Sequence, residues 1–170
     1  MSEILPYMHA AQELGFGEET LNFEAPMPEL PDTMILGTQE ELAEILATEN
    51  LVLEKYEDRS DIYLADSDDG SVRVILAQYD FYTALRLKLL MFMYPPEQDT
   101  SSYQLSYEET DSYRCLSWSR ADQQTYGIQV DQRGGWYLTV QVSWSEDPTT
   151  EAAQRAYAED LLKKLCFPDA

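Results

Sequence analysis

Polar and apolar residues alternate in four successive runs between residues 103 and 144 of this 170-residue chain. A period of two is typical of a β-strand with one buried face, and short polar turns between such runs favour antiparallel neighbours. In the last run a polar face lies opposite the apolar one, so we expect one packed side of the sheet and one that is wet or covered by another segment. The alternating apolar positions are Tyr103, Leu105, Tyr107, Leu116, Trp118, Tyr126, Ile128, Val130, Trp136, Leu138, Val140, Val142 and Trp144.

A closing helix is predicted for residues 147–167, after the last of these runs. Asp147, Pro148 and Thr149 are typical of a helix start. Behind them an apolar stripe repeats at four-residue spacing, which suits a helix that covers one face of the sheet. The stripe consists of Ala153, Tyr157, Leu161 and Leu165.

The first 50 residues predict two further helices. Pro6 opens a short N-terminal helix within residues 1–37, and the prolines after it favour an extended strap that ends in a short strand at Met34 to Leu36. Thr38 and Glu41 have the spacing of a capping box, which predicts an acidic helix over residues 38–50.

Residues 51–146 are expected to form the sheet. Besides the four runs above, strands are predicted at Leu51 to Tyr56, Ile62 to Ala65 and Val72 to Tyr79. Residues 81–94 fit either a strand or a helix, and we favour the strand. The fold class is therefore α+β: one domain over 1–170, with an antiparallel sheet of about six to eight strands and the helices packed on one face.

Negative charge is concentrated at the start of the chain. Residues 1–54 contain twelve carboxylates and no lysine or arginine, and the formal net charge of the whole chain is −21. Such a field repels the phosphates of nucleic acids and anionic membrane surfaces and attracts basic proteins. We therefore expect no nucleic-acid binding, and we expect a basic protein or a surface partner to meet Glu40, Glu41 and Glu44 of the acidic helix.

Several kinds of site are poorly supported by the residues present. Cys115 and Cys166 are too far apart in sequence for a zinc site or a disulfide framework, and His9 is the single histidine. No cofactor is expected. The sequence contains no apolar run of about 20 residues, so no membrane-spanning segment is expected. Its N-terminus does not resemble a signal peptide. A complete chain would be cytoplasmic, whereas an excised domain would come from a secreted or cell-surface protein.

The strongest metal candidate is the acidic segment of Asp66, Asp68, Asp69 and Gly70, because calcium prefers several carboxylate oxygens near a glycine turn. Its spacing departs from an EF-hand loop, since the twelfth position from Asp66 is Ala77 instead of glutamate. An ordinary hairpin turn explains the same residues without a metal, and we favour the turn.

Aromatic residues offer a second type of contact surface. If Tyr103, Tyr107, Tyr113 and Trp118 lie on the open face of the sheet, they form a surface suited to protein or glycan contact. Trp136 and Trp144 are expected in the core instead. With 32 carboxylates in the chain, a pair at the separation required for glycoside hydrolysis carries almost no information, so we expect no enzyme.

The stretch from Pro28, Glu29, Leu30 and Pro31 to the acidic helix at Thr38 to Leu42, with the tyrosine-rich strands after it, resembles uncharacterised domains of secreted Firmicutes lipoproteins. The resemblance covers about 20 residues and includes no specific motif. It implies a bacterial, surface-exposed domain without enzymatic activity. The sequence departs from that pattern in showing no lipobox cysteine and no signal sequence, which is expected only of a trimmed chain.

The leading functional hypothesis is a non-catalytic interaction domain that uses the open aromatic face or the acidic N-terminal surface. The alternative is a cytoplasmic inhibitor or immunity-type protein whose acidic half covers a basic partner. A calcium-dependent glycan-processing enzyme is a distant third hypothesis.

Overall fold

The computed structural model describes residues 29–57, 62–78, 103–120, 124–132, 136–144 and 148–167. The expected N-terminal helix and the ambiguous segment 81–94 lie outside these residues. The helices of the described part are α2 (Gln39–Ala47) and α4 (Pro148–Cys166), and its strands are β1 (Glu54–Lys55), β2 (Ile62–Asp66), β3 (Val72–Ala77), β4 (Tyr103–Glu109), β5 (Tyr113–Arg120), β6 (Thr125–Gln132) and β7 (Tyr137–Ser143).

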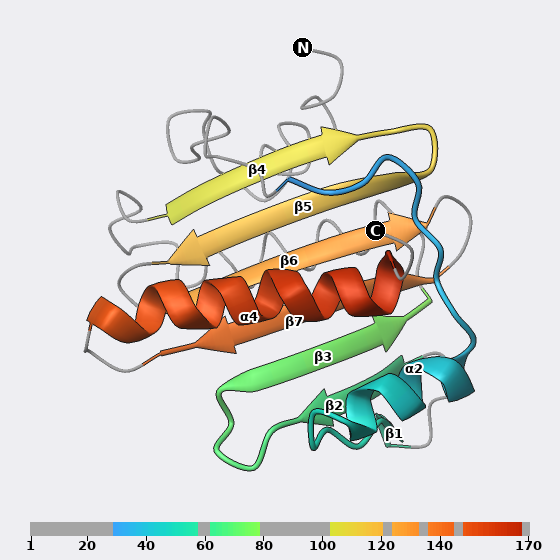
Figure 1. Ribbon diagram of the computed structural model, residues 1–170, viewed down its shortest axis with the longest axis horizontal. Helices are drawn as coiled ribbons and strands as arrows, with labels where there is room; N and C mark the ends of the chain where they lie inside the picture. Colours follow the sequence, from blue (N-terminus) through green and yellow to red (C-terminus); the bar gives the residue numbers. More distant parts are fainter. Residues whose placement is uncertain are drawn as a thin grey trace.

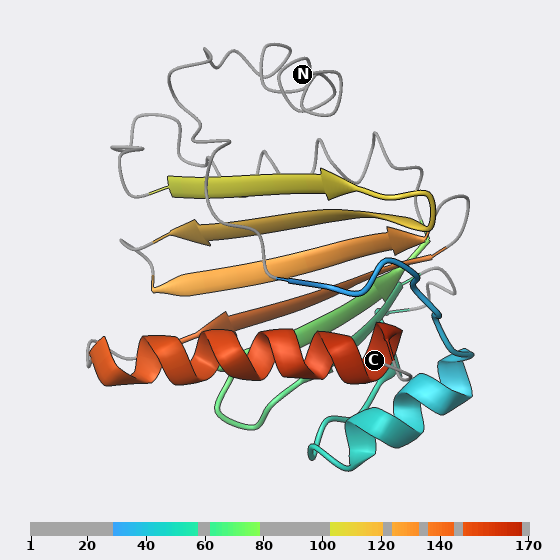
Figure 2. The same cartoon turned by 45° about the horizontal axis from the view of Figure 1, so that its top comes forward.

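All seven strands belong to one antiparallel sheet in the order β1-β2-β3-β7-β6-β5-β4 (Figure 1). Neighbours in the sheet are neighbours in sequence except at its centre, where β3 pairs with β7. There Val72 lies opposite Val142, and Ala77 lies opposite Tyr137. Both helices lie on the same side of the sheet (Figure 2), so the predicted α+β class, the strand number and the helix-covered face are confirmed.

The core fills the space between the sheet and the two helices, on the side that we call the helical face. Alternate strand residues point into it, as the period of two predicts. On α4 the buried positions are Ala158, Leu161, Leu162, Leu165 and Cys166, whereas Ala153 of the predicted stripe is exposed. A helix has 3.6 residues per turn, so a strict four-residue repeat drifts off the buried face over several turns. The strand residues of this core are Tyr63, Ala65, Val72, Val74, Leu76, Tyr113, Cys115, Tyr126, Ile128, Val130, Leu138, Val140 and Val142.

Trp136 and Trp144 are partly buried and pack against the core, so they lie at its margin and not at its centre. The Arg155 guanidinium carbon of α4 lies 6.0 Å from the ring centroid of Trp144. Two hydrogen bonds attach the same helix to the sheet: Gln154 donates to the carbonyl of Ser143 at 2.9 Å, and Tyr126 donates to Glu159 at 3.1 Å.

Helix α2 begins as the sequence predicts. The Thr38 hydroxyl accepts a hydrogen bond from the Glu41 amide at 3.2 Å, and the Glu41 carboxylate accepts one from the Thr38 amide at 3.3 Å. Together these bonds satisfy two amides that a helix start otherwise leaves unpaired. Leu42 and Leu46 anchor the helix in the core, where each is 1% exposed.

The strand predicted at Leu51 to Tyr56 is wrong in its length, since only Glu54 and Lys55 pair with β2. Asn50 ends α2 with a φ of 59°. The Leu51 amide then donates back to the Leu46 carbonyl at 3.0 Å. A left-handed residue of this kind reverses the chain, and Leu51 is turned into the core before pairing can begin.

The strand predicted at Met34 to Leu36 is also wrong. This part of the strap runs past the ends of β5 and α4 (Figure 1) without joining the sheet. The Ile35 amide donates to the Cys166 carbonyl at 2.8 Å, and the Met34 amide donates to the Ser112 hydroxyl at 2.9 Å. These contacts satisfy the backbone without a neighbouring strand.

The face of the sheet opposite the helices, here the second face, is not a simple wet surface. Thr139 is fully buried and donates to the side-chain oxygen of Gln129 at 3.1 Å, and Tyr137 is 8% exposed. Trp118 is 6% exposed and pairs in register with Gly127. One polar residue of β7, Thr139, is therefore buried and satisfied by its hydrogen bond to Gln129, and does not face water.

Candidate functional site

The outer face of α2 presents the acidic residues that the sequence singles out. Glu40, Glu41 and Glu44 are all exposed. Glu41 is engaged in the capping box. Glu40 and Glu44 make no ion pair within the described part of the chain, and no basic residue occupies the last turn of α2. Two like charges one turn apart repel by a few tenths of a kcal/mol, which offsets part of the stabilisation that the helix dipole gives to Glu40 in the first turn.

Glu49, just beyond α2, is held differently. Its carboxylate accepts hydrogen bonds from Lys164 at 3.0 Å and from the Tyr157 hydroxyl at 3.2 Å, both on α4. The bond from Lys164 lowers the pKa of Glu49 below its ordinary value. Partial burial, together with the neighbouring Glu49 carboxylate, raises the pKa of Tyr157 to about 12. Glu49 therefore joins the two helices and is not available to a partner.

Negative charge continues along the segment that follows α2. Glu54 and Glu57 are exposed, and Lys55 is the single base of residues 29–57. We call the exposed carboxylates of this region the acidic surface, which consists of Glu40, Glu41, Glu44, Glu54 and Glu57. The sequence indicated its α2 part, and the structure adds the two residues near β1.

The turn between β2 and β3 uses its carboxylates internally. Asp69 accepts hydrogen bonds from the amide of Ser71 at 3.0 Å and from the hydroxyls of Ser71 and Ser67 at 2.7 and 2.8 Å. These bonds lower the pKa of Asp69 to about 2, and the bond from the Ser71 amide has the largest effect. Gly70 has a φ of 75°, which a glycine adopts at no steric cost.

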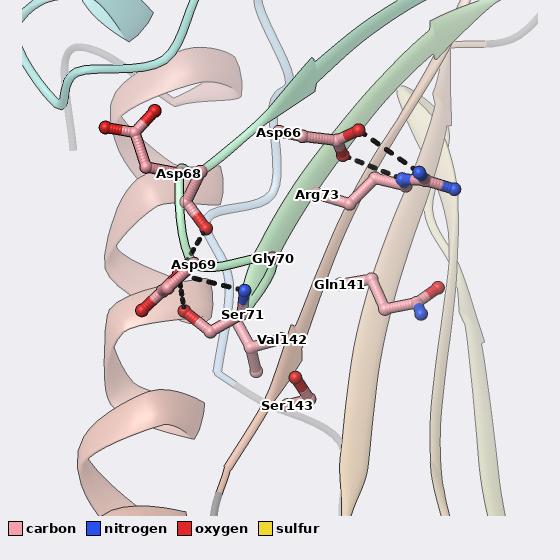
Figure 3. A pocket seen from close by; sticks show the side chains of 10 residues that line it. Asp66, Asp68, Asp69, Gly70, Ser71, Arg73, Gln141, Val142 and Ser143 are labelled. Atoms are coloured by element: carbon pink, nitrogen blue, oxygen red, sulfur yellow. Dashed lines mark hydrogen bonds and ion pairs between the residues drawn. The ribbon is translucent and has the colours of Figure 1, made fainter.

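Asp66 and Arg73 form an ion pair across this hairpin, with Nε of the arginine 2.7 Å from Oδ1. The side chain of Asp68 is turned away from that pair (Figure 3). A polar hollow of about 440 Å³ lies beside them, with Gln141 and Ser143 of β7 on its other side. Asp66 and Asp69 thus bind different partners, and Asp68 points away from both of them. Within the described segments, no three His, Cys, Asp or Glu side chains are grouped to hold a metal ion.

The expected aromatic surface is corrected at two of its four positions. Tyr113 is 1% exposed and donates to the carbonyl of Pro31 at 2.8 Å, and Trp118 is 6% exposed. Neither ring is presented to a partner, because Tyr113 packs under the strap against Phe167 and Trp118 packs over Gly127. The structure describes the backbone of β4. In the pairing of β4 with β5, Tyr103 lies opposite Arg120 and Tyr107 lies opposite Leu116. Their role in binding stays a prediction.

The two cysteines are both buried, and they form no disulfide with each other. Burial raises the pKa of Cys166 well above its ordinary range. A thiol that stays protonated is a poor nucleophile and a poor metal ligand. Both residues instead belong to the hydrophobic core, as is common for cysteine.

A second hollow, of about 360 Å³, lies at the β1 edge of the sheet. Val52 and Tyr56 line it and are 68% and 43% exposed. Both residues lie in the longer strand that the sequence predicts, so their exposure is not expected from it. The left-handed residues Asn50 and Glu57 set the limits of β1. Asn50 is the one local signal of this, because asparagine is enriched in the left-handed conformation that ends helices. The hollow also contains Asn50, Glu54, Lys55, Glu57, Leu64, Asp66 and Asp68.

No family model, curated protein or solved structure matches this chain. The resemblance to secreted lipoprotein domains therefore stays an expectation. Neither helix that the structure describes is long and apolar enough to cross a membrane.

Proposed function

We propose that this chain is a non-catalytic binding domain whose acidic surface contacts a basic protein. The observation that carries the proposal is the pair Glu40 and Glu44, two exposed carboxylates on one face of α2 with no ion pair in the described structure. Their mutual repulsion opposes folding, and a positively charged partner would convert it into attraction.

The surroundings of this pair support the proposal. The helix beneath it is fixed at its start by the capping box and along its inner face by buried Leu42 and Leu46. Glu49 attaches its end to α4. The carboxylates are thus carried by a rigid element, which lowers the entropy lost when a partner orders them.

Charge also determines the kind of partner. Residues 29–57 contain eight carboxylates and one base, in a chain of net charge −21. At ordinary salt the field extends about 10 Å from the surface and speeds the approach of a basic protein. Anionic partners are disfavoured by the same field.

The test is the binding of a folded basic protein, cytochrome c, measured by calorimetry at low and at moderate salt. We expect the variant Glu40→Gln/Glu44→Gln to bind roughly 2- to 30-fold more weakly, because each exposed charge contact contributes about 0.2 to 1 kcal/mol. The matched control is Asp111→Asn/Asp160→Asn, which removes two exposed charges elsewhere.

Equal weakening in both variants would mean that only the total charge matters and would refute a defined surface. Absence of binding by the native chain at low salt would refute the proposal as well. Loss of binding at moderate salt in the native chain, together with a clear difference between the two variants, supports it.

A further inference from the structure

Strand β1 forms one end of the seven-stranded sheet and contains two residues. Glu54 lies opposite Leu64, Lys55 lies opposite Tyr63, and the Tyr56 amide donates to the Ile62 carbonyl at 2.9 Å. In an antiparallel pair, residues directed toward the neighbouring strand alternate with residues directed away. The amide and carbonyl of Lys55 therefore face the outer edge, where a further strand could pair with them.

Apolar side chains are exposed beside this edge. Val52 and Tyr56 are two of the three large apolar residues exposed in the described structure, and the third is Ile35. Both line the hollow of about 360 Å³, which Leu64 of β2 also lines. Such side chains next to an open strand edge offer pockets for alternate residues of an added strand.

The charges around the hollow favour a positively charged occupant. Glu54, Glu57 and Asp68 line it without an ion pair in the described part of the molecule, while Asp66 is already paired with Arg73. Lys55 is the one base among the lining residues that the structure describes. An occupant with lysine or arginine at alternate positions would match these carboxylates.

We infer that the β1 edge accepts an extended segment of a partner protein, in which basic and apolar residues alternate, as an added strand. This inference rests on the proposed function and names the part of the partner that is bound. A second copy of this chain is a poor occupant, because its own net charge of −21 would bring like charges together at the edge.

Two substitutions at position 55 distinguish strand addition from simple charge attraction. Lys55→Gln and Lys55→Pro both remove the positive charge, so a purely electrostatic site would bind a basic peptide more tightly in both variants. Proline also removes the outward amide, and it is tolerated at an edge strand because it breaks no bond to β2. Strand addition therefore predicts opposite effects of the two substitutions.

The probe is an acetylated, amidated peptide of about eight residues, the length of an ordinary strand, with alternating lysine and valine. We expect Lys55→Gln to bind it about 2- to 5-fold more tightly than the native chain, and Lys55→Pro at least about 10-fold more weakly than Lys55→Gln. A peptide of alternating lysine and serine serves as the equally charged control. The native chain is expected to bind it about 5-fold more weakly or worse, since it offers no apolar side chains.

A second matched pair of variants tests the contribution of the exposed apolar side chains to peptide binding. Val52→Ser/Tyr56→Ser should remove the preference for valine over serine, whereas Ile35→Ser should keep it, because Ile35 is exposed outside the hollow. Far-UV circular dichroism of each variant, Lys55→Pro included, confirms the fold before binding is compared. If Lys55→Pro loses its fold, a peptide N-methylated on alternate residues replaces it, since this probe cannot pair with the edge and should bind about 10-fold more weakly.

The outcomes distinguish this inference from the proposed function. If Lys55→Pro binds as tightly as Lys55→Gln, strand addition is wrong, while a weakening by Glu40→Gln/Glu44→Gln toward cytochrome c would leave the acidic surface intact as a binding site. A concentration-dependent dimer in sedimentation that disappears in Lys55→Pro would also overturn it, because the occupant would then be a second copy.

Discussion

Gly127 is the position at which the packing of the second face can be tested most directly. A Cβ atom at this position would lie 2.6 Å from Cη2 of Trp118 and closer still to Cζ2 and Cε2. These atoms belong to a buried ring and not to the flexible end of a side chain, since Trp118 is 6% exposed. Gly127→Ala therefore forces the indole to move.

The expected loss of folding stability depends on where the indole ring can move. If the ring shifts within its site, overpacking destabilises the fold by about 1 to 3 kcal/mol. If it leaves the site, the loss approaches the about 3 to 5 kcal/mol of removing a buried tryptophan. Against this, alanine in place of a strand glycine recovers at most about 1 kcal/mol of backbone entropy. We expect a net loss of about 1 to 3 kcal/mol, or roughly 2 to 12 °C in melting temperature.

The assay is urea unfolding followed by far-UV circular dichroism, for the native chain, Gly127→Ala, Trp118→Ala and the double variant. Once the indole is gone, the added methyl group meets no ring, so Gly127→Ala should cost nothing in the Trp118→Ala background. The double-mutant cycle should give a coupling of about 1 to 3 kcal/mol. Additive effects, or a native-like stability of Gly127→Ala, would show that the tryptophan does not pack over this glycine.

Two predictions concern the attachment of α2. Thr38→Ala removes one half of the capping box and should lower the free energy of unfolding by about 1 kcal/mol, and Thr38→Ser should restore most of it; equal stability of all three proteins would contradict the cap. Glu49→Gln should cost a few tenths to about 1 kcal/mol at pH 7, since Lys164 is a largely exposed partner. Because the folded pKa of Glu49 is lowered from 4.5, its contribution is present above pH 4.5 and is lost as the pH falls through the folded value. The stabilities of native and Glu49→Gln protein should therefore converge as the pH falls below 4.5, and a difference that does not shrink in acid would contradict the ion pair.

The strand pattern of the second half of the chain could be predicted because side-chain alternation and burial agree there. Tyr126, Ile128 and Val130 all face the helices, and β7 pairs with β6 over its whole length. The capping box of α2 could be predicted equally well, because Thr38 and Glu41 are only three positions apart in the sequence. Both features depend on local chemistry.

Other features depend on contacts between distant residues and could not be predicted in this way. The sequence pattern is compatible with Tyr113 on the open face, but its hydroxyl donates to the carbonyl of Pro31, which is 82 positions away in sequence. Trp118 is buried because a glycine occupies the paired position on β6, and only the strand register reveals that pair. The exposed Val52 results from a chain reversal at Asn50, and asparagine, although enriched in the left-handed conformation, does not by itself specify it.

The pairing of β3 with β7 also affects how the chain is made. Ala77 emerges from the ribosome 60 positions before its partner Tyr137, so at a synthesis rate of 5 to 20 residues per second β3 waits about 3 to 12 s for its neighbour. Hairpins close in microseconds, and β2 and β3 can pair long before that. During this interval the nascent chain carries an open strand edge rich in valine and leucine. The carboxylates synthesised before it would then discourage nascent chains from associating through that edge, a role that requires no partner.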